Sequence, residues 1–181
     1  MKTGLRDNNK GFSLVELLAV IAIMALMLGM FLLSTNVIGS RACRQCQKQL
    51  RHELDQVRVA SMGKNKVVLH LYKNPDGKIM VQQTTTIAKL GGVAATEDVD
   101  GEEREIGSAR VVVEVEASDG ATYALNNSGV YFQFNRSTGA FKEISGGQVG
   151  GNYTIKKISI TGGGVTERLT LHGITGKVTE D

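Results

Sequence analysis

Tryptophan is absent from this chain of 181 residues, proline occurs once, and aromatic residues make up only 5%. So little proline excludes collagen-like and proline-rich linker proteins. The two cysteines, Cys43 and Cys46, are too few to build the disulfide framework of a small secreted domain. A formal charge of +3 is too small to indicate a nucleic-acid partner by itself.

The common catalytic patterns are also missing from the sequence. We find no His-Glu-x-x-His motif, no Ser/His/Asp or Cys/His set, and no paired carboxylates in an apolar setting. The glycine-rich stretches lack the Lys-Ser/Thr that follows a phosphate-binding loop. We therefore expect that the protein is not an enzyme and has no cofactor.

Charge is missing from one long segment near the N-terminus. Glu16 is the only charged residue from Phe12 to Ser40, and residues 17–33 contain no polar side chain. As a helix, residues 12–33 would be about 33 Å long, which is enough to cross the hydrocarbon core of a bilayer. This run exceeds the apolar region of about 7–15 residues in a signal peptide. A cleaved signal peptide and a plain uncleaved anchor are the alternatives.

Glu16 argues against both alternatives. A carboxylate at the edge of an apolar helix is costly and requires a compensating partner. No other charged residue lies between Gly11 and Arg41. If the chain were cut between Gly11 and Phe12, the new α-amino group would lie four residues before Glu16. That amine, on a neighbouring chain, could neutralise the carboxylate.

The segment Gly11-Phe12-Ser13-Leu14-Val15-Glu16-Leu17-Leu18 resembles the class III signal of type IV pilins and pseudopilins. The resemblance implies that a prepilin peptidase cuts after Gly11 and N-methylates Phe12. It also implies that Glu16 pairs with the Phe12 amine of an adjacent subunit during filament assembly. The implied partners are the prepilin peptidase, other pilin subunits through helix packing, the inner-membrane assembly platform, and the lipid bilayer before assembly.

The chain then divides into four expected parts. These are a leader (1–11), a transmembrane and filament-core helix (12–36), an amphipathic continuation (37–63) and a β-rich domain (64–181). The class III signal implies a cytoplasmic leader. The precursor is therefore expected to cross a bacterial cell membrane once, with its C-terminal domain outside the cytoplasm, before it enters a pilus or pseudopilus. Any unwinding of the helix is expected at Gly29 or Gly39, because glycine weakens a helix interior.

A stripe of small and apolar residues follows Arg41 and predicts that the helix packs on the next domain. Its members are three or four positions apart: Cys43, Cys46, Leu50, Leu54, Val57 and Ser61. The charged residues, Glu53 among them, are expected on the opposite faces. The basic residues from 41 to 51 are expected to be solvated or to contact lipid head groups and neighbouring subunits, with binding of an acidic polymer as the alternative. We interpret Cys43 and Cys46 as packing residues. A redox pair, half of a zinc site, and a disulfide within or between chains are the alternatives.

After Gly63 the apolar residues alternate with polar ones, as in half-buried strands. Strands are expected at residues 66–72, 79–86, 110–117, 121–125, 130–134, 141–144, 153–160 and 165–171. Asn74–Gly77 and Asp119-Gly120 are typical hairpin turns. The expected fold class is α+β, with the long helix on one face of an antiparallel sheet. The other face packs a second sheet or contacts water.

Residues 97–105 contain six carboxylates and two turn-prone residues. We interpret them as a solvated loop, because the ligand order of an EF-hand is missing. Calcium binding at this loop is the less favoured alternative.

The C-terminal pattern from Gly173 to Val178 resembles the GspH/FimT-like branch of minor pseudopilins. Some members of that branch bind DNA through basic residues near the C-terminus. Here Lys177 is isolated and precedes Glu180 and Asp181, so nucleic-acid binding is left open. The expected function is a minor structural subunit of a type IV pilus, a type II secretion pseudopilus or a competence pseudopilus. A DNA-binding pseudopilin of a DNA-uptake apparatus and a simple membrane-anchored β-domain protein are the alternatives.

Overall fold

The structure is a computed structural model that describes residues 13–63, 67–84 and 101–181, with residues 31–37 described by their backbone alone. It divides into two compact units, Met1–Thr35 and Asn36–Asp181, each treated by itself below. Helix α1 runs from Leu14 to Met62. Alanine, leucine and other good helix formers dominate its first half, and it contains no proline.

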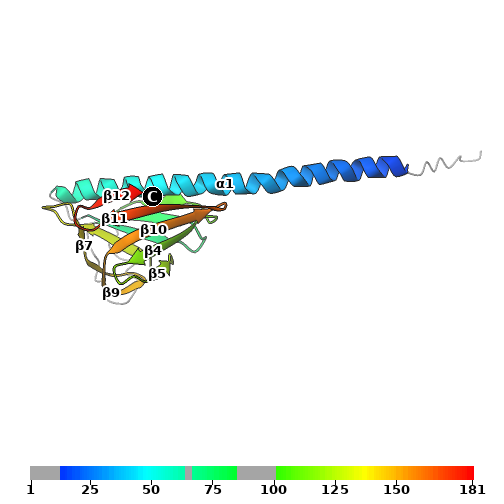
Figure 1. Cartoon of the computed structure of the whole chain (residues 1–181). Coiled ribbons are helices and arrows are strands. Elements are labelled where there is room, and N and C mark those ends of the chain that lie inside the picture. Colours follow the sequence, from blue (N-terminus) through cyan, green and yellow to red (C-terminus); the bar gives the residue numbers. More distant parts are fainter. Residues whose placement is uncertain (1–12, 64–66, 85–100) are drawn as a thin grey trace, which may run out of the picture. The chain divides into compact units, whose positions relative to one another are not determined.

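The strands of the second unit form three antiparallel sheets within the described residues (Figure 1). Sheet A has the order β3 (Glu103–Gly107), β2 (Ile79–Thr84), β1 (Val68–Lys73), β6 (Val130–Phe134), β7 (Phe141–Lys142). Sheet B has the order β12 (Lys177–Glu180), β11 (Val165–His172), β10 (Ile155–Gly162), β4 (Val112–Ala117), β5 (Thr122–Ala124). A separate hairpin pairs β8 (Ile144–Gly146) with β9 (Val149–Tyr153).

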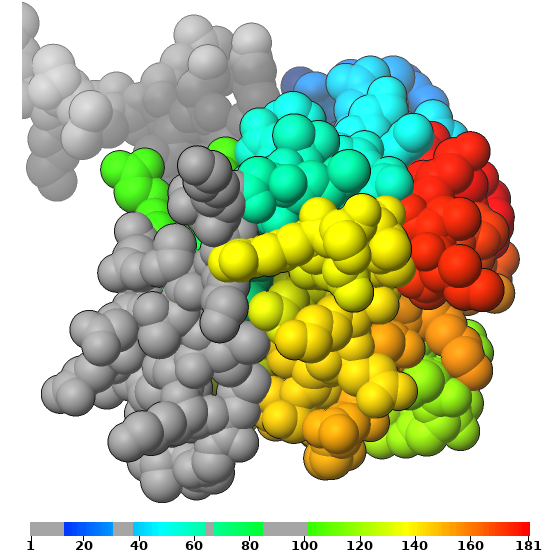
Figure 2. All heavy atoms as spheres, turned by 90° about the vertical axis from the view of Figure 1, so that its left-hand side faces the viewer, coloured from blue at the N-terminus to red at the C-terminus, as the bar shows by residue number. Residues whose placement is uncertain are grey.

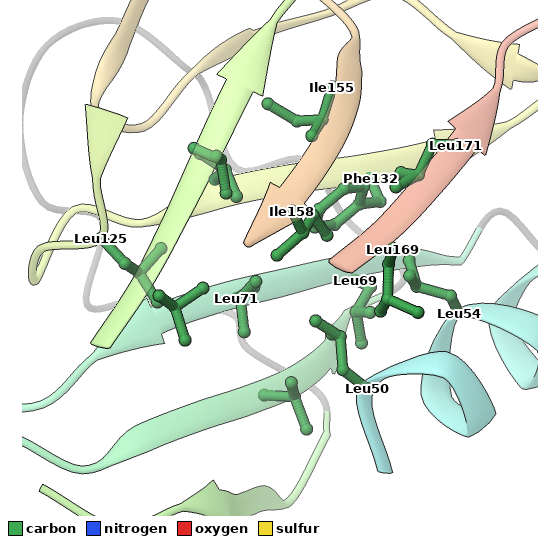
Figure 3. Close-up of a cluster of buried hydrophobic side chains, with 14 of the residues drawn as sticks. Leu50, Leu54, Leu69, Leu71, Leu125, Phe132, Ile155, Ile158, Leu169 and Leu171 are labelled. Carbon is green, nitrogen blue, oxygen red and sulfur yellow. The ribbon is translucent and has the colours of Figure 1, made fainter. Parts of the chain in front are cut away.

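One hydrophobic cluster joins the two large sheets to the second half of α1. Alternate residues of β1 and β10, such as Leu71 and Ile158, are fully buried, as expected for strands with one face in a core. Figure 3 shows Leu50 and Leu54 of the helix beside Leu69 of sheet A and Leu169 of sheet B. The helix therefore packs on the core where both sheets contribute to it.

The α+β prediction is confirmed, and the second sheet allowed for in the sequence analysis is present. Both predicted hairpin turns join paired strands, β1 to β2 and β4 to β5. The expected strand at 141–144 is two short strands in different sheets, β7 and β8. The prediction of a solvated loop at 97–105 is wrong from Glu103 onward, because strand β3 begins there and pairs with β2. Strands β9 and β12 were not predicted.

Gly39 is a site of close packing, and the helix continues through it. A Cβ atom at Gly39 would lie 2.7 Å from both the N and the Cα of Gly163, in the turn between β10 and β11. Ser40 Oγ also donates a hydrogen bond to the Gly163 carbonyl, at 3.2 Å. Glycine at position 39 thus lets the helix backbone approach the hairpin. The helix is not unwound at Gly39 or at Gly29 in this structure.

Candidate assembly segment and the helix interface

Helix α1 begins next to the predicted cleavage site. Gly11 and Phe12 lie outside the described residues, so the structure does not place them. The Ser13 carbonyl accepts hydrogen bonds from the backbone N–H groups of Glu16 and Leu17, at 2.9 and 3.1 Å. Glu16 therefore lies in the first helical turn, where a carboxylate interacts favourably with the helix dipole. Ser13 and Glu16 have the spacing of a capping box, a signal the sequence analysis missed.

In the first unit, all side chains of α1 that the structure describes are exposed. Every residue from Leu14 to Met30 is exposed, and the twelve large apolar side chains among them are 50–78% exposed. Glu16 is the single charged group in this stretch. An apolar surface of this kind normally indicates contact with lipid or with another protein.

The predicted transmembrane helix, residues 12–36, lies partly outside the described residues. Phe12 is not placed, and side chains 31–36 are not described. Among the residues that are described, no helix reaches the length and hydropathy needed to cross a membrane.

The predicted packing stripe of the second half of α1 is confirmed. All six of its members are at most 2% exposed: Cys43, Cys46, Leu50, Leu54, Val57 and Ser61. Burying six such side chains supplies much of the free energy that holds the helix on the β-domain. The residues that sequence spacing placed on one face thus all face the core.

Cys43 and Cys46 are both buried and are free thiols in the structure. Cys43 Sγ donates a hydrogen bond to the Ile160 carbonyl at 3.0 Å. Cys46 packs on Gly107, where an added Cβ atom would lie 2.9 Å from the Cys46 sulfur. Burial raises the pKa of the Cys43 thiol and raises that of Cys46 to about 12. Because the reactive species is the thiolate, both groups are poor nucleophiles near neutral pH.

Glu53 corrects the prediction that this residue lies on a face opposite the packing stripe. Its side chain is buried, pairs with Arg104 of β3, and accepts a hydrogen bond from Gln83. Two basic residues of the helix form ion pairs with the domain: Arg44 pairs with Glu167 at 3.1 Å, and Arg51 with Glu180 at 2.6 Å. These exposed pairs contribute little energy each. Figure 2 shows the C-terminal segment lying against α1, as the Arg51 pair requires.

The acidic stretch proposed as an alternative calcium site lies only partly in the described structure. Residues 97–100 are outside it. Of the remaining carboxylates, Glu105 pairs with Lys78 at 2.7 Å, and Glu103 begins β3. Within the described residues, no group of three His, Cys, Asp or Glu side chains is arranged to hold a metal ion.

The C-terminal basic residue proposed for nucleic-acid contact is in an edge strand. Lys177 is exposed at the start of β12, directly opposite His172 of β11. Glu180 of the same strand pairs with Arg51. From Lys64 to Asp181 the sequence has 13 Lys and Arg against 14 Asp and Glu, a net charge of −1. This net charge does not indicate a basic surface of the kind that binds DNA.

The family description "Prokaryotic N-terminal methylation motif" matches residues 6–32. The matched stretch includes Gly11, Phe12, Glu16 and the whole exposed apolar segment from Leu14 to Met30. No curated protein and no solved structure matches the chain.

The match supports a type IV pilin-like precursor with a class III signal, whose N-terminus is cleaved and methylated. Such a signal favours a structural role over a catalytic one, together with processing by a prepilin peptidase and assembly with other pilins. It also favours a protein that is first anchored in the membrane and then assembled. The match covers none of the β-domain.

Proposed function

We propose that the protein is a minor structural subunit of a type IV pilus, or of a related type II secretion or competence pseudopilus. Its precursor is held in a bacterial cell membrane by residues 12–36, with the β-domain outside the cytoplasm. Prepilin peptidase cuts after Gly11 and methylates the Phe12 amine. The inner-membrane assembly platform then transfers the subunit from lipid into the filament.

One observation carries this proposal: a wholly exposed apolar helical segment with a single carboxylate in its first turn, inside the methylation motif. Lipid and a bundle of equivalent helices both remove such side chains from water. Transfer from one to the other therefore keeps the apolar surface buried. The step changes the surroundings of only one charged group in this segment, Glu16.

The electrostatics of the helix start support a pairing of Glu16 between subunits. After cleavage the Phe12 amine would lie just before the helix, where the positive end of the helix dipole disfavours a positive charge. A carboxylate from a neighbouring subunit relieves both this repulsion and its own desolvation. Glu16 and Phe12 are thus the proposed assembly pair.

The test is a Glu16→Gln substitution in the native host, which removes the charge and keeps the shape. We expect normal removal of the leader, measured by mass spectrometry of the N-terminus. We expect incorporation into sheared or pelleted filaments to fall by about tenfold or more, because the amine then lacks its partner. Glu114→Gln is the matched control, since Glu114 is an exposed carboxylate of β4.

Two results would contradict the proposal. Normal incorporation of the Glu16→Gln subunit would remove the pairing role. If the protein with its natural sequence still carried residues 1–11 in the host, it would not be a cleaved precursor at all.

A further inference from the structure

A pocket of about 260 Å³ lies at the end of the β6–β7 hairpin of sheet A. Its lining combines two cations, two amides and two apolar side chains: Arg136, Lys142, Gln133, Asn135, Val67 and Phe134. Figure 2 shows the yellow hairpin segment at the surface of the molecule. The segment belongs to the β-domain, far in sequence from the methylation motif.

Strand register brings the polar groups of this pocket together. Gln133 of β6 is directly opposite Lys142 of β7, so their side chains share one face of the sheet. Arg136 follows in the connecting turn. That turn is fixed at Asn135, whose side-chain oxygen accepts the Ser137 N–H at 3.0 Å and whose carbonyl accepts the Gly139 N–H at 2.8 Å.

Three of these polar residues, unlike Asn135, have no side-chain partner among the described residues. Within the described residues, neither Arg136 nor Lys142 forms an ion pair or a side-chain hydrogen bond, in contrast to Arg44, Arg51 and Arg104. The Gln133 residue is 9% exposed. Its side-chain amide has no hydrogen-bond partner among the described residues, and its N and O atoms are not fully buried, so they can be reached from the pocket. An acceptor bound in the pocket would therefore find three side chains that are free to donate hydrogen bonds to it.

The lining defines the chemistry of the missing acceptor. Two cations and an amide N–H donor match the oxygens of one carboxylate. Val67 and Phe134 also line the pocket and are 9% and 3% exposed, so they offer only a small apolar area, which suits a short stem. The net charge of −1 over residues 64–181 does not favour an extended polyanion such as DNA.

We propose that this pocket binds a carboxylate on a short aliphatic stem. Arg136 and Lys142 pair with the carboxylate, the Gln133 amide donates a hydrogen bond to it, and Val67 and Phe134 contact the stem. The source of this group is either an acidic side chain of a protein partner or a free short-chain organic acid. The site does not depend on the N-terminal segment, so it stands whether or not the filament role is correct.

The test is an NMR titration of the full chain in a non-ionic detergent. One arm uses a blocked Gly-Gly-Glu-Gly-Gly peptide and another uses free glutarate. We expect saturable shifts of the Gln133 side-chain amide and the Arg136 guanidinium signals, with weak, roughly millimolar affinity, as is usual for exposed ion pairs. The arm that binds more tightly identifies the source of the carboxylate.

Matched variants and probes make the result specific. In Arg136→Gln/Lys142→Gln we expect affinity to fall about tenfold, because two charge-assisted contacts are lost. Arg110→Gln/Lys177→Gln removes two exposed cations elsewhere, and we expect no change. The proposal is overturned if the glutamine version of the peptide binds equally well. It is also overturned if the Arg136→Gln/Lys142→Gln chain binds as the unmodified one does, or if only inorganic phosphate or a short DNA duplex shifts these signals.

Discussion

Arg104 of β3 forms a two-point ion pair with Glu53 of α1. Arg104 Nη1 lies 2.8 Å from Glu53 Oε1, and Nη2 lies 3.2 Å from Oε2. Gln83 donates a third contact to the same carboxylate, at 3.0 Å. The Glu53 side chain is only 6% exposed, whereas that of Arg104 is 49% exposed. The carboxylate therefore depends on the pair far more than the guanidinium does.

This asymmetry predicts unequal effects of removing either partner. Arg104→Ala leaves a buried carboxylate without its countercharge and is expected to cost about 3 kcal/mol of unfolding free energy. For a chain of this size that lowers the melting temperature by roughly 6–12 °C. Glu53→Gln leaves a half-exposed cation that water can solvate, so we expect a clearly smaller loss. Thermal unfolding of the full chain, followed by circular dichroism, measures both.

Arg110→Ala is the control for this comparison, because Arg110 is exposed and forms no ion pair among the described residues. Its melting temperature should stay within about 2 °C of the unmodified chain. Equal losses for Arg104→Ala and Glu53→Gln would show that burial of Glu53 does not set the cost.

Two helix glycines provide a second test with a built-in control. A Cβ atom at Gly39 would lie 2.7 Å from backbone atoms of Gly163, whereas a Cβ atom at Gly29 would have no neighbour within 4 Å. We expect Gly39→Ala to destabilise the chain by about 1–3 kcal/mol through overpacking, despite the better helix propensity of alanine. Gly29→Ala should be neutral or stabilising by up to about 1 kcal/mol.

Urea unfolding of both glycine variants separates packing from propensity. A stabilised Gly39→Ala chain would show that the contact with the β10–β11 turn is not tight in solution. Destabilisation of both variants by the same amount would contradict the packing explanation as well.

The spacing of apolar residues predicted the helix stripe and most strands, because in those elements one face is buried and the other is not. Leu50, Leu54 and Val57 recur at helical spacing and are all buried. β3 was missed because its residues from Glu103 to Glu105 are exposed on both faces, so no alternation marks the strand. β9 was missed because its glycines leave only Val149 and Tyr153 buried. In such segments pairing with a neighbouring strand, which sequence does not reveal locally, decides the structure.

The candidate sites differ in the same way. The predicted cleavage signal is contiguous, so Gly11, Phe12 and Glu16 could be proposed from the sequence, and their roles stay predictions. The Glu53–Arg104 pair joins residues 51 positions apart, and the carboxylate pocket joins Val67 to the β6–β7 hairpin. Only strand register and helix docking bring these residues together. For this reason the sequence did not predict that Glu53 is buried and paired.

The buried thiol of Cys46 predicts a loss of stability in alkali. Burial raises the pKa of this thiol to about 12, from 9.0 in an exposed thiol. The unfolded chain therefore releases the proton at lower pH than the folded chain does. The stabilising contribution is complete below about pH 9 and is lost as the pH rises from about 9 to 12.

Urea unfolding at several pH values above neutrality measures this effect. Because Tyr153 also has a pKa raised to about 12 by burial, the unmodified chain must be compared with Cys46→Ala. We expect the free energy of unfolding to fall less steeply with pH in Cys46→Ala than in the unmodified chain. Val57→Ala, a truncation in the same buried stripe, should lower stability at every pH without changing the slope. Identical slopes for the unmodified chain and Cys46→Ala would contradict a buried, protonated thiol.

The cleavage site itself gives the last prediction. Gly11→Val places a branched side chain at the residue before the cut, where the class III signal has glycine. We expect the leader, residues 1–11, to remain attached, and the Phe12 amine to stay unmethylated because it is never released. Intact mass of the protein from its host measures both outcomes together. Gly29→Val changes a glycine in the same motif but away from the cut and should be processed normally. A mature N-terminus at Phe12 in the Gly11→Val chain would place recognition by the peptidase elsewhere in the motif.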